Sequence, residues 1–433
     1  MVQIYRPTKR QTALKAQTLT INSLDLHGQG VARYQQQVCF VPGALPGESV
    51  KVALTRKGNI LQGQLLALHQ ASAQRISPAC PHYAQCGGCQ LQHLSQADQL
   101  HYKQVALAQL LERQGLSPVQ WAEPLKGPAW GYRRTLRLAT FKGRVGFRAR
   151  ASQSIVSVDS CPVADPLLSA LLPSLQQLVS SLADSKALGH IELLSLPPQR
   201  AALWRLTGPL KPADRQKLLA WASEQQLLLF CQLGDTVEQL LPSVPVALGY
   251  TLDGLQLSVG AADFIQVNGS VNDAMVAQAM AWLAPQTGER ILDAYSGLGN
   301  FSLPLAKRGA QVLAAEGVAA MTARCQANAR ANGLQLTART IDLDDAKAVA
   351  QLLADPLDAV LLDPARPGAR VLCQALAEAG PRRVLYVSCN PATWKRDAVL
   401  LQQGGYRLQQ LGLMDMFTQT AHVELMALFI REK

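Results

Sequence analysis

The C-terminal part of the chain alternates short apolar strands with helical stretches, and this alternation constrains the fold most. From about residue 261 onward, four apolar runs read as strands, and the stretches between them read as helices. These runs are Arg290–Asp293, Gln311–Ala315, Ala359–Leu362 and Arg383–Val387. Strands that alternate with helices in this way predict a doubly wound α/β domain, a parallel sheet with helices on both faces.

The glycine-containing loop after the first of these strands predicts an adenosine-containing cofactor. The run Ile291–Phe301 leads from a strand, through a turn that holds Gly297 and Gly299, into a helix. Glycine lets a ligand lie against the backbone at the carboxyl edge of the sheet. Glu316 ends the next strand, 19 residues after Gly297, where a carboxylate can accept both hydroxyls of a ribose. Asp293 favours a cationic ligand such as S-adenosylmethionine; a purely structural strand–turn–helix is the alternative.

Later strand ends carry a carboxylate and a cysteine, and the last apolar strand carries a second carboxylate. Asp363 follows an apolar strand, and Cys389 ends the next one. A cysteine there is either a buried small hydrophobic residue or a nucleophile, and the polar Asn-Pro turn after it favours the nucleophile. Glu424 lies in an apolar terminal strand. It is either an outward-facing residue of an edge strand or a buried carboxylate with a function.

These side chains together predict methylation at carbon 5 of uracil. A Cys389 thiolate that adds to carbon 6 turns the ring into an enolate, whose carbon 5 then attacks the methyl group of the cofactor. Glu424 removes the carbon-5 proton, and the thiolate leaves. Methyltransferases that act on exocyclic amines often carry an aromatic residue in the Asp363 segment, and its absence here argues against that chemistry. The target base must be single-stranded or flipped out of its stack.

The chain resembles the class I RNA uracil-C5 methyltransferases over nearly its whole length. The resemblance implies a Rossmann-like domain that uses S-adenosylmethionine, with Cys389 as nucleophile and Glu424 as base. The landmarks that carry it are Asp293-Ala-Tyr-Ser-Gly-Leu-Gly-Asn-Phe, Asp363-Pro-Ala-Arg, Ser388-Cys-Asn-Pro and His422-Val-Glu. The contacts to S-adenosylmethionine that it implies come from Gln266, Tyr295, Asn300, Glu316, Asp342 and Asp363.

Three positions depart from the commonest pattern of the family. Ile265 stands where a second Phe is usual, Tyr295 replaces Phe, and Thr418 replaces the Pro that usually follows Met-Phe. None of these changes removes a chemical group that the mechanism needs, and only Thr418 bears on the geometry before Glu424. Cytosine-C5 methyltransferases commonly carry their nucleophile in a Pro-Cys step in the segment that here holds Asp363. No cysteine stands there, which favours uracil over cytosine.

Four of the nine cysteines predict a metal centre. Cys80, Cys86 and Cys89 share a compact loop, and Cys161 lies far downstream. Four thiolates bind either zinc or a [4Fe–4S] cluster, and three close cysteines with one distant partner are more typical of the cluster. The resemblance agrees, since the ribosomal-RNA members of the family carry this cluster. We expect a structural role for it, because methyl transfer requires no electron; four unrelated buried thiols are the alternative.

The chain carries 41 Lys and Arg against 30 Asp and Glu, and two segments account for the net charge of +11. Residues 1–70 have a net charge of +6 and residues 126–150 a net charge of +8. Localised positive charge suits a polyanion such as RNA, although a soluble enzyme with a basic tail is the alternative. Residues 17–68 read as short strands separated by glycine and proline, which favours an OB-like barrel. This region resembles a TRAM domain, whose relatives bind RNA; an ordinary β-module is the alternative.

We therefore predict a multidomain protein with three parts. They are an OB-like, TRAM-type RNA-binding barrel at residues 1–70, a central α+β domain with the iron–sulfur cluster at 71–260, and a Rossmann-like methyltransferase domain at 261–433. Within the family, TRAM together with the cluster implies methylation of one uracil of 23S rRNA. The alternatives are another rRNA uracil or tRNA with the same chemistry, or a non-catalytic RNA-binding iron–sulfur protein.

The sequence also predicts where the protein works. No stretch approaches the 18 apolar residues of a membrane span, and the first ten residues lack the apolar core of a secretory signal. An odd number of cysteines without an export signal favours a reducing compartment. We therefore expect a cytoplasmic protein, acting as a monomer.

Overall fold

The computed structural model of the chain describes residues 15–244 and 246–432, and the chain divides into two compact units. The first unit comprises Met1–Ala79, Cys89–Ala108 and Gln419–His422. The remainder, which includes the glycine loop and the predicted catalytic residues, forms the second unit. The first 14 residues of the predicted N-terminal domain lie outside the described residues.

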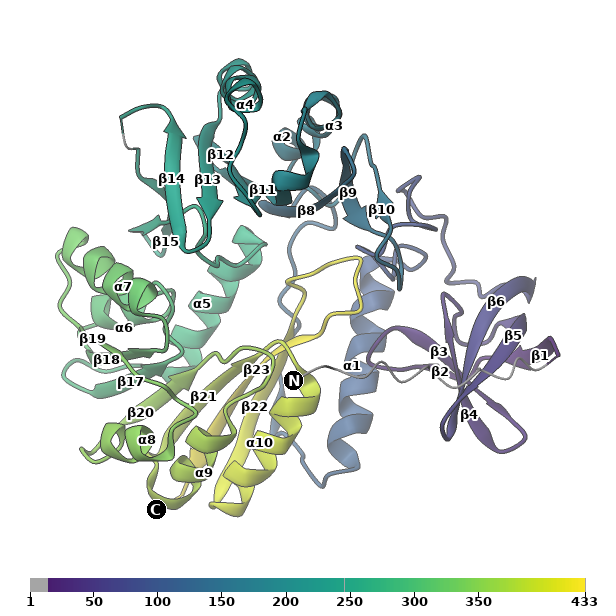
Figure 1. Ribbon diagram of the computed structural model, residues 1–433. Helices are drawn as coiled ribbons and strands as arrows, with labels where there is room; N and C mark the ends of the chain where they lie inside the picture. The colour runs from purple at the N-terminus through teal and green to yellow at the C-terminus, as the bar shows by residue number, and fades with distance from the viewer. Residues whose placement is uncertain (1–14, 245, 433) are drawn as a thin grey trace, which may run out of the picture. The chain divides into compact units, whose positions relative to one another are not determined.

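The first unit is built on a six-stranded sheet with the order β1-β5-β6-β4-β3-β2, drawn in purple tones in Figure 1. Neighbouring strands are antiparallel except for β4 and β6, which run parallel. Apolar side chains such as Ile21, Val41 and Val52 form a core that belongs to this sheet. The strands are β1 (Gln17–Thr20), β2 (Ser23–Leu24), β3 (Gln29–Tyr34), β4 (Gln37–Pro42), β5 (Ser49–Lys57) and β6 (Ile60–Gln70). The next element along the chain is helix α1 (Gln96–Glu112).

A buried ion pair ties the segment after β6 to this sheet. Glu48 is fully buried, and its carboxylate oxygens lie 2.5 and 2.7 Å from Nε and Nη2 of Arg75. The same carboxylate accepts hydrogen bonds from the backbone N–H groups of Leu45 and Ser72. Burial by itself raises the pKa of Glu48, but the hydrogen bonds and the charge of Arg75 outweigh it and hold the pKa below its ordinary value.

We expect Glu48→Ala to lower the free energy of unfolding by about 2–3 kcal/mol, because it leaves the Arg75 guanidinium and two N–H groups without their acceptor. Because the folded pKa is lowered, the carboxylate stabilises the fold above its unfolded pKa. This contribution is lost as the pH falls through the folded pKa. Urea unfolding at neutral and at acidic pH measures both effects, with Glu48→Gln as the control of equal size. If Glu48→Ala unfolds at the same midpoint concentration of urea as the wild type, the expectation is contradicted.

The second unit begins with a seven-stranded sheet of the order β10-β9-β8-β11-β12-β13-β14. One face of this sheet packs against helices α2, α3 and α4, and the edge-to-face contact of Trp204 with Trp221 joins β12 to α4. The elements are β8 (Thr135–Phe141), β9 (Arg144–Arg148), β10 (Ile155–Val156), α2 (Pro166–Ser169), α3 (Leu172–Ser181), η1 (Ser185–Ala187), β11 (Leu188–Leu196), β12 (Gln199–Leu206), α4 (Pro212–Glu224), β13 (Leu228–Leu233) and β14 (Thr236–Leu241).

The C-terminal sheet of the second unit has eight strands in the order β19-β18-β17-β20-β21-β23-β22-β7. Strands β17 to β21 run parallel, as the sequence predicts, but β23 runs antiparallel between β21 and β22. Nine residues join β22 to β23, which is too short for a parallel crossover. The strands are β7 (Gln120–Trp121), β17 (Arg290–Ala294), β18 (Gln311–Glu316), β19 (Thr337–Thr340), β20 (Ala359–Leu362), β21 (Arg383–Ser388), β22 (Tyr406–Met414) and β23 (Glu424–Arg431).

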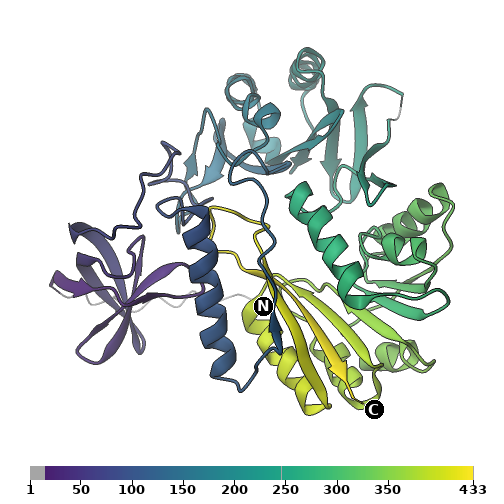
Figure 2. The same cartoon turned by 180° about the vertical axis from the view of Figure 1, so that it is seen from behind.

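Helices cover both faces of this sheet. Side chains of α5, α6 and α7 pack with Leu361 and Leu385 on one face, while Tyr386 and Phe429 contact α10 on the other. Helix α10 lies in front of the sheet in Figure 1, and α5 lies in front of it in Figure 2. No helix among the described residues is long and apolar enough to cross a membrane. The helices are α5 (Gly269–Leu283), α6 (Ser302–Lys307), α7 (Ala319–Ala331), α8 (Ala346–Leu352), α9 (Arg370–Ala379) and α10 (Pro391–Gln403).

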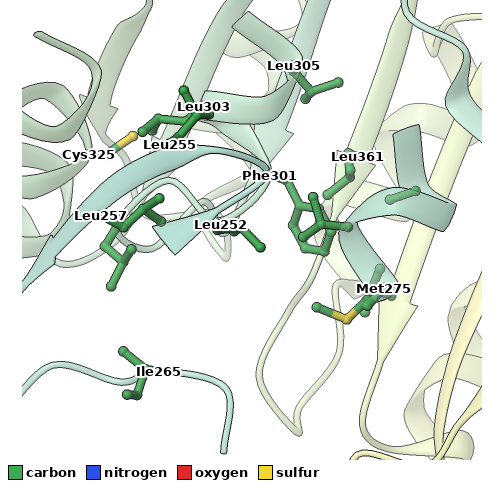
Figure 3. Packing of buried hydrophobic residues seen from close by; sticks show 14 of the residues in the cluster. Leu252, Leu255, Leu257, Ile265, Met275, Phe301, Leu303, Leu305, Cys325 and Leu361 are labelled. Atoms are coloured by element: carbon green, nitrogen blue, oxygen red, sulfur yellow. The ribbon is translucent and has the colours of Figure 1, made fainter. Parts of the chain in front are cut away.

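The hydrophobic core of this sheet extends to the glycine loop. A hairpin of β15 (Leu248–Leu252) and β16 (Leu255–Val259) precedes α5, and its leucines belong to the same buried cluster as Phe301 and Leu303. Figure 3 shows these side chains together with Cys325 of α7. Because the end of the glycine loop is part of the core, the backbone of the loop is held by close packing.

Candidate active site

Strand pairing brings Asp363, Cys389 and Glu424 to one edge of the eight-stranded sheet. Strands β20 and β21 run parallel, so Asp363 and Cys389, which directly follow them, lie at the same edge. Strands β21 and β23 run antiparallel, and the last pair in their register is Ser388 with Leu425. The next positions along these two strands are Cys389 and Glu424. The predicted nucleophile and the predicted base are therefore neighbours across the sheet.

Glu424 is a buried carboxylate in the interior of the sheet. It is 6% exposed, and its strand β23 lies between β21 and β22. The alternative that Glu424 faces outward on an edge strand is therefore wrong. A carboxylate that is held away from water next to a thiol is placed to take part in proton transfer.

The Cys389 thiol lies in an environment that opposes its ionisation. Burial raises the pKa of this half-buried thiol to about 11, and the negative charges of Glu424 and Asp363 act in the same direction. The positive charge of Arg366 acts in the opposite direction. A thiol with this pKa is protonated near neutral pH, so its use as a nucleophile requires activation within the site.

The glycine loop between β17 and α6 has left-handed backbone at three positions. The φ angles of Tyr295, Gly297 and Gly299 are 63°, 55° and 103°. A Cβ atom at Gly299 would lie 2.2 Å from the side chain of Leu303, so only glycine fits there. A left-handed tyrosine is uncommon and is typical of functional sites. The loop thus turns sharply at the carboxyl edge of the sheet, where α/β folds bind ligands.

Glu316 is fixed against this loop. Its carboxylate accepts a hydrogen bond from the backbone N–H of Gly297 at 3.0 Å and another from that of Val318 at 2.9 Å. Each carboxylate oxygen has a second acceptor site, so the group remains able to accept two hydroxyls. The hydrogen bonds orient Glu316 for the ribose contact that the sequence predicts.

Buried polar atoms around the loop lack partners. Within the described residues, Oδ1 of Asp293, Oη of Tyr295 and Oγ of Ser296 make no hydrogen bond. Burial raises the pKa of both Asp293 and Asp363 to about 7, and the charges of Glu316 on Asp293 and of Asp293 on Asp363 add to it. Such a site is costly unless a ligand satisfies it. Its residues fit a polar, cationic ligand, and S-adenosylmethionine is one.

Two other predicted cofactor contacts lie near the glycine loop. Asn300 forms a reciprocal pair of amide hydrogen bonds with Asn272 of α5, at 3.0 and 3.1 Å. Asp342 is exposed and follows β19. Burial raises the pKa of Tyr295, and the charge of Asp342 contributes to that shift, so the two side chains lie within electrostatic range.

Arg134 is a residue of this region that sequence reasoning missed. Its Nε donates a hydrogen bond to the backbone carbonyl of Gln266 at 2.7 Å, and its backbone N–H donates to Val267 at 2.9 Å. The guanidinium lies 4.4 Å from the ring centroid of Tyr250. Arg134 thus holds the segment of the predicted cofactor residue Gln266. Arg134 lies among several other basic residues in the sequence, and nothing in that segment predicts that this arginine binds the Gln266 backbone.

Comparisons with known proteins decide the family. A family model described as tRNA (Uracil-5-)-methyltransferase matches residues 255–432, and a TRAM domain model matches residues 10–66. A 23S rRNA (uracil(1939)-C(5))-methyltransferase of Shewanella amazonensis is 44% identical over 99% of this chain and 99% of its own. Another of Aeromonas salmonicida is 42% identical over 99% of this chain and 100% of its own. This chain belongs to the RNA uracil-C5 methyltransferases.

A solved structure shares the fold of this uracil-C5 methyltransferase. The Pyrococcus abyssi tRNA (uracil-54, C5)-methyltransferase, in complex with S-adenosyl-L-homocysteine, matches with a TM-score of 0.76 at 23% identity. The match covers 95% of this chain and 99% of that one. The predicted TRAM domain at the N-terminus and the predicted Rossmann-like methyltransferase domain are confirmed.

The four cysteines that the sequence predicts as cluster ligands all have intermediate exposure. Cys80, Cys86 and Cys161 belong to the second unit, whereas Cys89 belongs to the first. Burial raises the pKa of Cys86 and of Cys161, and the charge of Cys80 adds to both shifts. The three thiols thus lie within electrostatic range. In the described parts of the chain, no group of three or more His, Cys, Asp or Glu side chains is arranged to hold a metal ion.

Proposed function

We propose that this protein transfers the methyl group of S-adenosylmethionine to carbon 5 of one uracil in 23S rRNA. The observation that carries the proposal is the strand register that makes Cys389 and Glu424 neighbours beside Asp363. Relatives that are 41–44% identical over nearly the full chain are named as methyltransferases of carbon 5 of uracil 1939 in 23S rRNA. The TRAM domain and the basic segments of the chain agree with an RNA substrate.

In the proposed mechanism, Cys389 acts as the nucleophile and Glu424 as the base. The Cys389 thiolate forms a bond to carbon 6 of the uracil, and the electron pair of the C5–C6 double bond moves into an enolate. Carbon 5 takes the methyl group, and the sulfonium sulfur of S-adenosylmethionine keeps the electron pair of the broken bond. Glu424 then takes the proton from carbon 5, the double bond re-forms, and the thiolate leaves.

The cofactor contacts are proposed for six residues around the glycine loop. Glu316 accepts the ribose hydroxyls, and the acidic side chains at the strand ends attract the cationic groups of the donor. When bound, S-adenosylmethionine supplies an electrophilic methyl group. The six residues are Gln266, Tyr295, Asn300, Glu316, Asp342 and Asp363.

Labelled S-adenosylmethionine and RNA fragments test this function. We expect label in a 23S rRNA fragment that contains the target uracil and none in the same fragment with that uracil replaced by cytosine. Label in tRNA or at another rRNA uracil, with none at this position, would show that the protein methylates that substrate by the same chemistry. Binding of RNA without transfer of label to any uracil would favour a non-catalytic iron–sulfur protein and contradict the proposal. An rRNA substrate also agrees with a cytoplasmic location, and we propose that the protein acts as a monomer.

We also propose that the central part of the chain holds a [4Fe–4S] cluster on four thiolates. The donor set supports this, because three of the four thiols, those of Cys80, Cys86 and Cys161, lie within electrostatic range of one another. A cluster would join two distant parts of the chain, since one cysteine stands 72 residues after the others. Its proposed role is structural. The ligands are Cys80, Cys86, Cys89 and Cys161.

Anaerobic purification tests the cluster. We expect a coloured protein with about four iron and four sulfide ions per chain. Cys80→Ser is expected to lose most of this iron, whereas Cys231→Ala, which changes a buried cysteine of β13, is expected to retain it. A colourless wild-type protein that contains zinc and no iron would contradict the proposal.

A further inference from the structure

The turn between β20 and α9 is attached to the first turn of α10. The backbone carbonyl of Arg366 accepts hydrogen bonds from Nδ2 of Asn390 at 2.9 Å and from Oγ1 of Thr393 at 3.0 Å. Asn390 directly follows Cys389, and its side-chain oxygen also caps α10. The backbone of Arg366 is therefore held next to the residue that follows the nucleophile.

The other end of this turn is fixed by a buried carboxylate. Asp397 of α10 is fully buried, and it accepts a hydrogen bond from the backbone N–H of Ala369 in the turn at 2.8 Å. It also accepts hydrogen bonds from Oη of Tyr386 at 2.7 Å and from Nε of Arg396 at 2.8 Å. Gly368 has a φ of 80°, and a Cβ atom there would lie 2.5 Å from Oδ2 of Asp397. The close approach requires glycine and leaves the turn little freedom to move.

Charged side chains from three elements act on Cys389. Glu424 comes from β23, Asp363 follows β20, and Arg366 comes from the turn. The two carboxylates disfavour a thiolate, whereas the guanidinium favours it. The Arg366 side chain is exposed and forms no ion pair with any residue that the structure describes. No paired carboxylate therefore offsets the effect of its positive charge on Cys389.

We propose that Arg366 activates the nucleophile by stabilising the thiolate of Cys389, and that Thr393 and Asp397 are positioning residues that hold the Arg366 backbone in place. The proposal rests on the proposed function, because it assumes that Cys389 attacks the substrate. The S–H bond breaks, the sulfur keeps the electron pair, and the proton passes to solvent. The anchored turn holds the Arg366 backbone next to the residue that follows Cys389, and the charge of the side chain acts on the thiol against the two negative charges.

Alkylation of Cys389 by iodoacetamide tests the proposal without RNA or S-adenosylmethionine, because the reagent reacts with the thiolate. The rate is followed against pH by mass spectrometry of the Cys389 peptide. The midpoint of the pH profile is the pH at which half of the thiol is ionised. We expect Arg366→Met to move this midpoint upward by about 1 pH unit, which slows alkylation near neutral pH about tenfold. Arg366→Lys, which keeps the charge, is expected to move it less. Arg370→Met removes an equal, exposed charge four residues later and is expected to leave the midpoint unchanged.

A midpoint in Arg366→Met that equals those of wild type and Arg370→Met would overturn the proposal. Thr393→Val removes one hydrogen bond to the Arg366 carbonyl and is expected to cause a smaller upward shift. No shift in Thr393→Val would overturn the positioning role of that residue. Failure of the proposed function is distinguishable, because it would appear as a wild-type protein that methylates no uracil, whatever the alkylation profile.

Discussion

Replacing Cys389 with alanine is expected to lower the rate of uracil methylation by about 10⁴-fold or more. The alanine variant lacks the sulfur that adds to carbon 6, and without that addition carbon 5 of uracil is too weak a nucleophile to attack the methyl group. Transfer of labelled methyl groups from S-adenosylmethionine to a 23S rRNA fragment measures the loss under single-turnover conditions.

The Cys389→Ala variant should keep its fold and its cofactor affinity. Cys389 is half-buried at the end of β21 and is not part of the glycine loop, so the dissociation constant for S-adenosylmethionine should change less than about twofold. Calorimetric titration of the variant with the cofactor provides this control. A variant that transfers methyl groups as fast as the wild type would show that Cys389 is not the nucleophile.

Replacing Glu424 with glutamine is expected to slow turnover by about 10²–10⁴-fold and to trap the enzyme on its RNA. Glutamine has nearly the same size as glutamate, but its amide does not accept the carbon-5 proton. Addition of Cys389 and methyl transfer precede this step, so the methylated base should remain bonded to sulfur. Denaturing gel electrophoresis of the reaction measures the fraction of protein that is covalently joined to labelled RNA.

The double variant Cys389→Ala, Glu424→Gln is the matched control for this adduct. Because it lacks the attacking sulfur, it should form no covalent complex at all. If Glu424→Gln turns over normally, or loses activity without accumulating an adduct, Glu424 does not act as the base after methyl transfer. The comparison thus separates a role in elimination from a role in folding or RNA binding.

Much of the α/β sheet and of its site could be predicted from local patterns. The runs that became β17, β18, β20 and β21 each contain consecutive apolar residues, because a strand with helices on both faces buries both of its faces. Parallel strands in such a sheet end at a common edge. Asp293 near the end of one strand, and Asp363 and Cys389 directly after two others, were therefore placed at that edge. The glycines at 297 and 299 marked the turn that the backbone makes there.

Glu424 shows where such patterns stop. An apolar run with one carboxylate fits an edge strand or an interior strand equally well, since the side chains alternate in the same way in both. Which strands pair with one another depends on contacts between segments that are distant in the sequence. Here β23 lies between β21 and β22. That insertion buries Glu424 and makes it the neighbour of Cys389 across the sheet.

The sequence by itself determined the chemical groups of this protein and the order of its elements, because residue types and hydrophobic periods are local properties. The tertiary structure alone decided which groups act on one another. The buried Asp397 that fixes the turn carrying Arg366, and the Arg134 guanidinium bound to the Gln266 carbonyl, come from segments 28 and 132 residues away from their partners. Such contacts depend on how strands pair and helices pack, and no short stretch of the chain specifies them.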